Sequence, residues 1–385
     1  MGNLNRTAVA GIGETDYSKD SGRSELRLAA EASLAAIRDA GLSPSDIDGM
    51  VTFAMDSNDE LELMRSLGVT HLGWAARTPF GGAGANATVQ LAASAVASGA
   101  AKAVLVYRAF NERSGRRFGQ PNPAGGYGGS PGRADFHAAY GLDTPAKIYA
   151  LWYQVYMQRY GVTNEDLGRY VVQARQYAAT NPRAWYYQQP ITLDDHQASR
   201  WIVEPILRKL DCCQESDGGC ALVVTSLERA RDLKQPVVRV LGATQSHARG
   251  SFIMHNYYKS DLAEQDEMKA QGQMLWNTTG LKPADIDVAM IYENFSPVVL
   301  MSLESHGFCK PGEAKDFIAD GQIGPGGALP VNTNGGLLGE AYIHGVNNIL
   351  EGVRQVRGTA ANQVPGAETA FVSARHSAII FGPDG

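Results

Sequence analysis

One eight-residue motif occurs twice in this chain. Residues 41–48 read GLSPSDID and residues 280–287 read GLKPADID, so six of the eight positions match at an offset of 239 residues. In both copies a stretch with helical periodicity precedes the motif and a short apolar run follows it. Repeats in solenoid proteins recur every ~20–50 residues. The much longer spacing here predicts two similar α/β halves, which usually share one active cleft between them.

The charge and hydropathy of the chain exclude several classes of function. Its 385 residues carry a net charge of -6, with Lys and Arg scattered along the sequence, whereas a nucleic-acid interface needs a basic face or stripe. No apolar run approaches the ~20 residues of a membrane-spanning helix, and residues 1–17 lack the basic and apolar regions of a secretory signal. We therefore expect a cytoplasmic protein with no polynucleotide or membrane partner.

Metal and disulfide chemistry are not expected either. The four cysteines, at positions 212, 213, 220 and 309, show no Cys-x-x-Cys spacing, so neither a zinc site nor a disulfide scaffold is indicated. The eight histidines form no His-x-His or His-Glu-x-x-His pattern. The sequence thus predicts reduced thiols and no metal in this chain.

The predicted organisation is two halves separated by an insertion. Residues 1–107 and 206–234 are expected to form the first half, and residues 235–385 the second half. From residue 108 the composition shifts to Gly, Pro, Arg and Asn. Residues 108–135 are expected to form a long loop, which at this length is usually functional or poorly ordered. Residues 108–205 as a whole are expected to form an inserted loop domain that includes a helical layer.

Two helical stretches indicate where the core lies. Residues 83–99 are rich in alanine, which predicts a helix that packs closely inside the protein and leads into an apolar strand at 103–107. Residues 144–160 are rich in Tyr and also contain Trp. Such an aromatic helix is more typical of a core or an oligomer face than of a ligand site.

The chain resembles the thiolase superfamily in three features. These are the duplicated halves, the small-residue helix after a Gly-rich turn, and residues 332–345, which read NTNGGLLGEAYIHG. The resemblance covers nearly the whole chain and is closest to the lipid-transfer and sterol-carrier-protein-x branch, whose members act on acyl-CoA thioesters. It implies a duplicated five-layer α-β-α-β-α fold with an inserted helical loop domain, and a homodimer at the core of the assembly.

The sequence departs from the thiolase pattern at the nucleophile. Thiolases carry a catalytic Cys at the start of the buried helix, and the matching position here is Gly82. Their second catalytic Cys lies in the last Gly-rich loop, which matches residues 373–377, SARHS, again without Cys. An acyl-cysteine intermediate requires a thiolate. Claisen chemistry at these positions is therefore not expected.

Two further thiolase positions are tyrosines in this chain. Counting from Gly335 and Gly336, the catalytic His of the family falls on Tyr342, and the Asn of its Asn-Glu-Ala-Phe motif falls on Tyr292. These tyrosines resemble the steroid side-chain-cleaving retro-aldolases, as do three neighbouring segments, YRAFNERSG (107–115), LDCCQE (210–215) and GEAYIHG (339–345).

This resemblance implies cleavage of a β-hydroxyacyl-CoA, such as a 17-hydroxy-pregnene-carboxyl-CoA, to a ketone plus propionyl-CoA or acetyl-CoA. Tyr292 is the predicted base for the substrate hydroxyl, and Tyr342 the predicted enolate stabiliser and acid, although the two roles could be exchanged. A tyrosine pKa of about 10 makes a poor base unless a neighbouring charge or hydrogen bond lowers it. Tyr257 and Tyr258 are candidates for a second oxyanion donor.

Further candidates concern substrate binding. Gly82, Gly335 and Gly336 fit loops where the backbone approaches a ligand closely, and Arg113 lies in the long Arg-rich loop. His344 is also a candidate. Because it follows Tyr342 by two residues in a predicted helix, the two side chains would point roughly 200° apart, which favours a structural or partner-facing histidine.

Two other functions stay open from the sequence. Loss of both cysteines would also describe a non-catalytic subunit that binds acyl-CoA or lipid, and an unaligned Cys would allow a true thiolase. The resemblance further implies a partner with a zinc-ribbon and an OB-fold domain, linked to an enoyl-CoA hydratase. Zinc is expected only in that partner, and no cofactor is expected in this chain, since the CoA thioester is the substrate.

Overall fold

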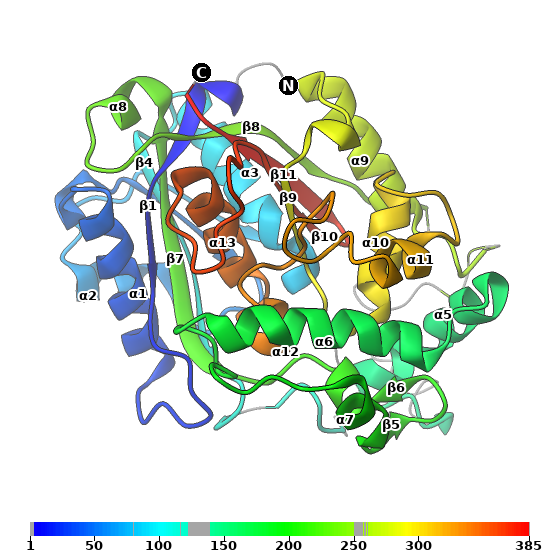
Figure 1. Ribbon diagram of the computed structural model, residues 1–385. Helices are drawn as coiled ribbons and strands as arrows, with labels where there is room; N and C mark the ends of the chain where they lie inside the picture. Colours follow the sequence, from blue (N-terminus) through cyan, green and yellow to red (C-terminus); the bar gives the residue numbers. More distant parts are fainter. Residues whose placement is uncertain are drawn as a thin grey trace.

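The computed structural model describes residues 4–79, 81–115, 117–121, 139–249, 257, 259 and 261–384. Within these residues the main strands form one sheet of nine, in the order β3-β2-β4-β7-β1-β8-β11-β10-β9, and Figure 1 shows helices packed around and between its two parts. The first five strands in this order belong to the first half of the chain and the last four to the second half.

The elements of the first half are β1 (Thr7–Glu14), α1 (Glu25–Asp39), β2 (Gly49–Phe53), α2 (Glu60–Leu67), β3 (Trp74–Thr78), α3 (Ala85–Ala97), β4 (Ala103–Asn111), β7 (Asp217–Ser226) and α8 (Leu227–Arg231). Between β4 and β7 lie α5 (Pro145–Tyr160), α6 (Asn164–Thr180), α7 (Leu193–Ala198), β5 (Trp201–Val203) and β6 (Leu207–Arg208). The second half contains β8 (Val238–Gln245), α9 (Asp266–Thr279), β9 (Val288–Ile291), α10 (Pro297–Ser305), α11 (Ala314–Ala319), α12 (Gly336–Gly339), α13 (Val346–Arg357), β10 (Ala370–Ala374) and β11 (Ser377–Gly382).

The duplicated motif folds in the same way in both halves. Helices α1 and α9 are each followed by a glycine with left-handed backbone, Gly41 at φ 74° and Gly280 at φ 75°, a conformation that glycine adopts without a Cβ clash. A short 3-10 turn follows, in which Asp46 or Asp285 accepts a hydrogen bond from the backbone N–H three residues earlier. Strands β2 and β9 then begin, so local interactions give each copy the same path.

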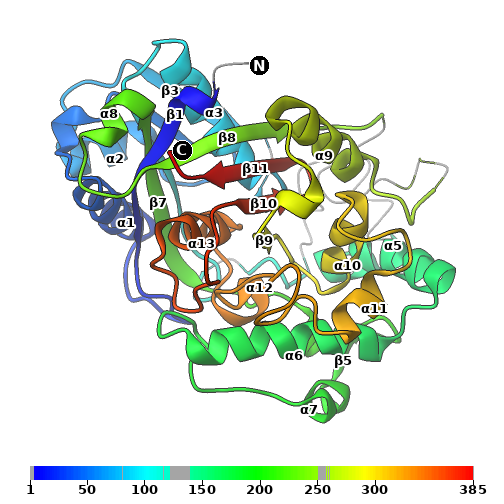
Figure 2. The ribbon, with the colours of Figure 1, turned by 45° about the horizontal axis from the view of Figure 1, so that its top comes forward.

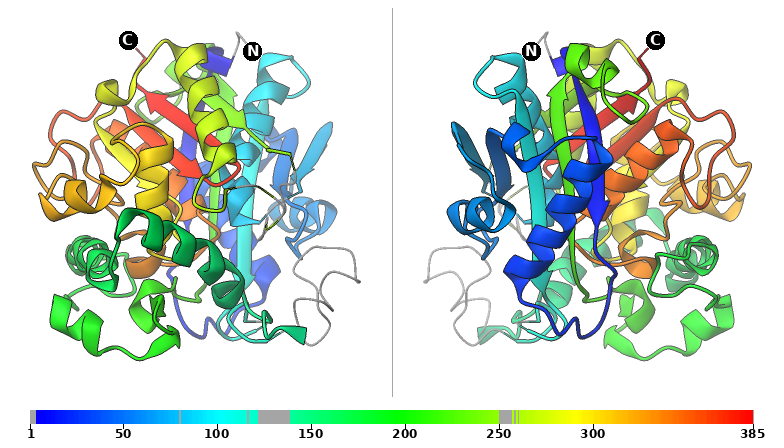
Figure 3. Two further views of the ribbon diagram at one scale, coloured as in Figure 1. Left: turned by 90° about the vertical axis from the view of Figure 1, so that its right-hand side faces the viewer. Right: turned by 90° about the vertical axis from the view of Figure 1, so that its left-hand side faces the viewer.

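The two halves stack into five layers. Helix α1 packs on β1, β4 and β7, and α9 packs on β8 and β11, while α3 and α13 contact strands of both halves. Figure 3 shows the halves side by side. They meet along a short antiparallel pairing of β1 with β8. This is the α-β-α-β-α order that the thiolase resemblance implies.

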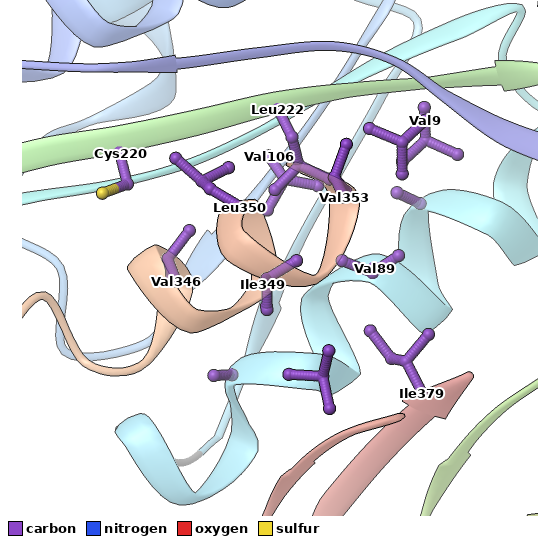
Figure 4. Close-up of a cluster of buried hydrophobic side chains, with 14 of the residues drawn as sticks. Val9, Val89, Val106, Cys220, Leu222, Val346, Ile349, Leu350, Val353 and Ile379 are labelled. Atoms are coloured by element: carbon purple, nitrogen blue, oxygen red, sulfur yellow. The ribbon is translucent and has the colours of Figure 1, made fainter. Parts of the chain in front are cut away.

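The central layer is apolar and tightly packed. Figure 4 shows Val89 of α3 and Ile349, Leu350 and Val353 of α13 gathered with Leu222 of β7, and all five side chains are fully buried. The small residues of α3 allow this close approach, as the alanine-rich sequence predicts.

The inserted helices cover one end of the sheets. Figure 2 shows α6 running below α12 and α13, and α6 begins with a capping box in which the Thr163 and Asp166 side chains bond to each other's backbone N–H. The aromatic side chains Tyr149, Trp152, Tyr153 and Tyr156 of α5 are buried. Strand β4 extends to Asn111, past the expected start of the insertion at residue 108, and the domain boundaries remain a prediction.

One expected helix begins later than predicted. Residues 342–357 have helical periodicity, but α13 starts at Val346, because His344 and Gly345 have left-handed backbone with φ of 49° and 80°. Tyr342 therefore lies on an irregular segment before the helix. In the part of the chain that the structure describes, no helix has the length and apolar character needed to cross a membrane.

Candidate active site

The structure brings the two predicted tyrosines together. Tyr292 follows the last residue of β9, and its backbone N–H donates to the carbonyl of Ser373 on β10 at 2.8 Å. Tyr342 reaches the same point from the segment before α13. The two hydroxyl oxygens are 2.7 Å apart, within hydrogen-bonding distance, and both side chains are buried. One phenol therefore donates a hydrogen bond to the other.

Gly82 lies directly against the ring of Tyr292. A Cβ atom on Gly82 would overlap the Cε2, Cζ and hydroxyl oxygen of Tyr292, and a Cβ on Gly345 would lie 2.7 Å from Cδ2 of the same ring. This edge of the Tyr292 ring therefore packs directly against the backbone of Gly82 and Gly345. Tyr292 thus occupies the space that a side chain at position 82 would need, and position 82 is the one that the sequence resemblance matches to the thiolase nucleophile.

A segment of the first half connects the two turns that carry the tyrosines. In this segment, residues 212–216, the N–H of Cys213 donates to the carbonyl of Asn294 at 2.9 Å, and the N–H of Gln214 donates to the carbonyl of Leu337 at 3.1 Å. Asn294 is two residues beyond the first tyrosine, and Leu337 precedes the second by five. The segment therefore sets the relative position of the two turns.

Gly335 and Gly336 lie beneath the site rather than on its surface. A Cβ on Gly336 would collide with Oε1 of Glu293, and a Cβ on Gly335 would lie 2.5 Å from Cβ of Ala178 on α6. The Glu293 carboxylate accepts from the N–H of Leu337 at 2.7 Å, and burial raises its pKa to about 8. Among the described residues neither glycine lines the cavity, so their role in substrate binding stays a prediction.

The tyrosine pair opens into a large cavity. Its volume is 1310 Å³, above the roughly 300–1,000 Å³ of a typical small-ligand pocket. Four of the predicted site residues besides Tyr292 line it, namely Gly82, Arg113, Tyr342 and His344. The side chain of Arg113 is exposed at this wall.

The candidates for a second oxyanion donor do not reach the tyrosine pair in the described structure. The Tyr257 hydroxyl donates to the carbonyl of Ile148 at 2.7 Å, and Tyr257 is not among the described residues that line the cavity. Tyr258 lies outside the described residues. The predicted role of these two tyrosines stays a prediction.

The electrostatics of the site keep both tyrosines protonated. Burial raises the pKa of Tyr292 and of Tyr342 well above the ordinary value of 10, and the neighbouring Cys213 and Glu112 raise both further. The sequence left open how a neighbour would lower a tyrosine pKa to make a base. The surroundings instead raise the pKa of both tyrosines, so the pair consists of two neutral phenols.

The cysteines of this wall are thiols rather than thiolates. Burial raises the pKa of Cys213 well above its ordinary value, and burial also raises the pKa of Cys212. A thiolate is the nucleophilic form, so neither has the character of a thiolase nucleophile. Among the described residues no group of His, Cys, Asp and Glu side chains is arranged to hold a metal ion, and the absence of a metal stays a prediction.

His344 lies beside Tyr342 and not on another face. The two rings meet edge to face with centroids 5.2 Å apart, because the segment is a turn with left-handed backbone and not the expected helix. The 200° separation expected for a helix is therefore wrong. His344 is buried and lines the cavity.

The sequence reasoning missed charged residues that lie on the first-half strands or shortly after them. Glu112, directly after β4, is 2% exposed and lines the cavity, and its Oε2 atom has no hydrogen-bond partner among the described residues. Burial raises the pKa of Glu112 well above its ordinary value. Arg108 on β4 and Asp56 after β2 form a buried ion pair at 2.7 Å. Arg108 and Glu112 lie in residues 107–115, one of the segments on which the resemblance to the retro-aldolases rests. That resemblance could have identified both as candidate site residues.

Comparison with known proteins decides the family. Residues 250–379 match a family model described as Thiolase C-terminal domain-like. The steroid side-chain-cleaving aldolase of Thermomonospora curvata is 54% identical over 364 residues, which cover 94% of this chain and 93% of that protein. The chain belongs to the steroid side-chain-cleaving aldolase family.

Another relative and a solved structure support the same family assignment. The 17-hydroxy-3-oxo-4-pregnene-20-carboxyl-CoA lyase of Mycobacterium tuberculosis is 52% identical over 371 residues, 96% of each chain. A solved structure described as the Ltp2-ChsH2(DUF35) aldolase superposes with a TM-score of 0.95 at 51% identity, covering 100% of this chain and 99% of that one. The predicted thiolase-like α/β fold and the predicted carbon–carbon lyase are thereby confirmed.

Proposed function

We propose that this aldolase cleaves the side chain of a steroid β-hydroxyacyl-CoA of the 17-hydroxy-pregnene-carboxyl-CoA type, and releases a steroid ketone plus propionyl-CoA or acetyl-CoA. The observation that carries the proposal is the hydrogen-bonded pair of neutral tyrosines on the wall of a large cavity. The names of the two relatives support the steroid thioester as substrate.

The reaction balances without an oxidant or an acyl-enzyme. The substrate hydroxyl loses a proton as its oxygen becomes the ketone oxygen, and the electron pair of the breaking C–C bond moves into the thioester enolate. The α-carbon of the enolate then takes a proton. One proton leaves oxygen and one arrives at carbon, so we expect no redox cofactor in this chain.

The tyrosine pair suits this proton balance. Tyr292 accepts the hydroxyl proton while its own proton passes across the 2.7 Å contact to Tyr342, and Tyr342 delivers a proton to the α-carbon. Transfer along such a chain never accumulates a phenolate, so the raised pKa values of both phenols are compatible with it. The direction could be reversed with the same balance.

The two alternatives fit the site less well. A non-catalytic acyl-CoA or lipid-binding subunit has no need for two buried phenols in contact with each other. A thiolase needs a thiolate, whereas burial keeps the thiols of this wall protonated.

We further propose that the enzyme functions as a homodimer joined to a partner protein. The solved aldolase with the TM-score of 0.95 is described together with ChsH2(DUF35), which supports a partner of this kind. The finer details come from the sequence resemblance: a zinc-ribbon and OB-fold partner, linked to an enoyl-CoA hydratase and holding the zinc itself.

The test is Tyr342→Phe, assayed alone and after co-expression with such a partner. With a 17-hydroxy-pregnene-carboxyl-CoA substrate, the wild type should release ketone and propionyl-CoA, and the variant should lose at least about 100-fold in kcat, the usual worth of a general acid. Binding of propionyl-CoA should be retained. Wild-type turnover in Tyr342→Phe, or no cleavage by the wild type with its partner, would refute the proposal.

A further inference from the structure

A buried chain of three side chains from both halves ends at His344. The Arg108 Nε–H donates to Nδ1 of His344 at 3.1 Å, and Nη1 of Arg108 donates to Oδ2 of Asp56 at 2.7 Å. Asp56 also accepts, through Oδ1, from the backbone and side chain of Asn58 at 2.8 and 2.7 Å. The carboxylate and the guanidinium are thus buried together with their hydrogen bonds satisfied, as a buried ion pair requires.

This arrangement determines which ring nitrogen of His344 carries the proton. Every nitrogen of a guanidinium donates and none accepts, so the nitrogen that faces Arg108 must present its lone pair. A neutral imidazole carries one N–H, which therefore lies on Nε2. Burial, and then the charge of Arg108, hold the pKa of His344 well below its ordinary value, so the ring stays neutral.

The orientation of the ring is fixed by aromatic neighbours. It stacks on Phe110 with centroids 4.9 Å apart and on Phe118 at 5.3 Å. A Cβ on Gly81 would lie 3.6 Å from Cε1 of His344, so the ring edge between the two nitrogens faces the glycine turn that precedes α3. The Nε2 atom has no hydrogen-bond partner among the described residues, although His344 lines the cavity.

We infer that His344 is a fixed, neutral N–H donor to the thioester oxygen of the substrate, and that Arg108 and Asp56 are its positioning residues. This inference rests on the proposed function. A retro-aldol reaction builds negative charge on the thioester oxygen as the enolate forms, and a preorganised donor stabilises that charge most in a water-poor site. Tyr292 and Tyr342 already serve in proton transfer in the proposed reaction. The Tyr257 hydroxyl donates its hydrogen bond to the carbonyl of Ile148.

A neutral donor suits the enolate better than a cation would. A protonated histidine would place an N–H against the N–H of Arg108 and bury a second positive charge beside it. The neutral ring instead keeps its one N–H on Nε2, free to donate, because burial and Arg108 hold the pKa of His344 well below its ordinary value. Donation by a neutral imidazole whose pKa is held low is a known way to polarise a carbonyl.

The first experiment separates enolate stabilisation from steroid cleavage. His344→Phe should lower kcat for cleavage by about 100-fold with little change in KM, as removal of one oxyanion donor does. It should equally slow exchange of the α-protons of propionyl-CoA in D2O, which needs the enolate but no steroid. His344→Gln, which keeps an N–H, should recover part of both activities. His306→Phe is the control, because His306 is also buried but packs on Phe371 away from the cavity.

The outcomes distinguish the two proposals. If the wild type cleaves and exchanges but His344→Phe matches it in both assays, the inference on His344 is wrong and the aldolase function stands. If the wild type and its partner neither cleave nor exchange, the proposed function fails and the inference falls with it. If His306→Phe loses as much activity as His344→Phe, the effect is structural, and the inference is overturned.

The second experiment reads the tautomer directly. Nitrogen NMR of the 15N-histidine-labelled enzyme, with His344→Gln to assign the signal, should show Nε2 protonated and Nδ1 bare. In the double variant R108M with D56N, which removes the cation without leaving an unpaired carboxylate, both tautomers should appear and kcat should fall while KM changes little. A protonated Nδ1 in the wild type, or an unchanged tautomer in the double variant, would overturn the positioning role.

Discussion

Substitution of Gly82 by Ala tests whether the Tyr292 ring fills the space beside this position so closely that no side chain fits there. The backbone of Gly82 is not in the left-handed region, so alanine is not strained there by its own φ. The added Cβ would instead overlap the Tyr292 ring, where an ordinary carbon contact needs about 3.5–4.0 Å. The ring would have to move by more than about 1 Å to restore that separation.

A ring movement of this size would disrupt the hydrogen bond between the Tyr292 and Tyr342 hydroxyls. The two hydroxyl oxygens are 2.7 Å apart, and an O–H···O bond weakens beyond about 3.0 Å. Overpacking of a dense core typically costs about 1–3 kcal/mol in the free energy of unfolding. Loss of proton transfer through the pair should lower kcat by at least about 100-fold.

Two measurements check this reasoning. Urea unfolding of Gly82→Ala should show the lower stability, and the cleavage assay should show the lower kcat. The double variant G82A with Y292A removes the ring, so its stability loss should be smaller than the sum of the two single losses. Wild-type stability and activity in Gly82→Ala would refute the steric argument, and so would additive losses in the double variant.

Two further predictions concern buried groups of the site. The pKa of Glu293 is raised from an ordinary 4.5 to about 8, so the folded state binds its proton more tightly, and stability should fall as the pH rises through this range. In Glu293→Gln the fall in Tm between pH 5.5 and pH 8 should be smaller than in the wild type, and an equal fall would contradict the assignment. Because burial keeps Cys213 a thiol, Cys213→Ser should cleave at nearly the wild-type rate and iodoacetamide should inactivate the enzyme slowly. Loss of cleavage in that variant would favour a thiolase.

The elements that could be predicted are those determined by local interactions. The eight residues of the repeated motif contain the helix-ending glycine and the Asp of the turn, and the apolar run after each copy forms the strand, so the structure repeats this path in both halves. The tyrosine pair was also accessible, because each tyrosine stands at a fixed count from a recognisable motif. The 2.7 Å contact between them depends on the packing of both halves and could not be read from spacing.

The remaining features of the site depend on contacts between distant segments. The left-handed backbone of His344 and Gly345 interrupts a stretch whose periodicity is helical, so the position of the histidine beside Tyr342 was not predictable from a helical wheel. Arg108 meets Asp56 and His344 across long sequence separations. Burial first, and then the nearby Glu215, raise the pKa of Glu112, and both act only in the folded protein.

The overlap between position 82 and the ring of Tyr292 also decides whether a thiolase nucleophile could share this site with the tyrosine pair. On this backbone, a Cys at position 82 would leave no room for the Tyr292 ring in the orientation seen here. A side chain at position 82 and Tyr292 in its present orientation therefore exclude each other, so one site of this shape cannot hold both a nucleophilic cysteine and the tyrosine pair. For the same reason, restoring Cys at position 82 alone would damage the aldolase without recreating a thiolase.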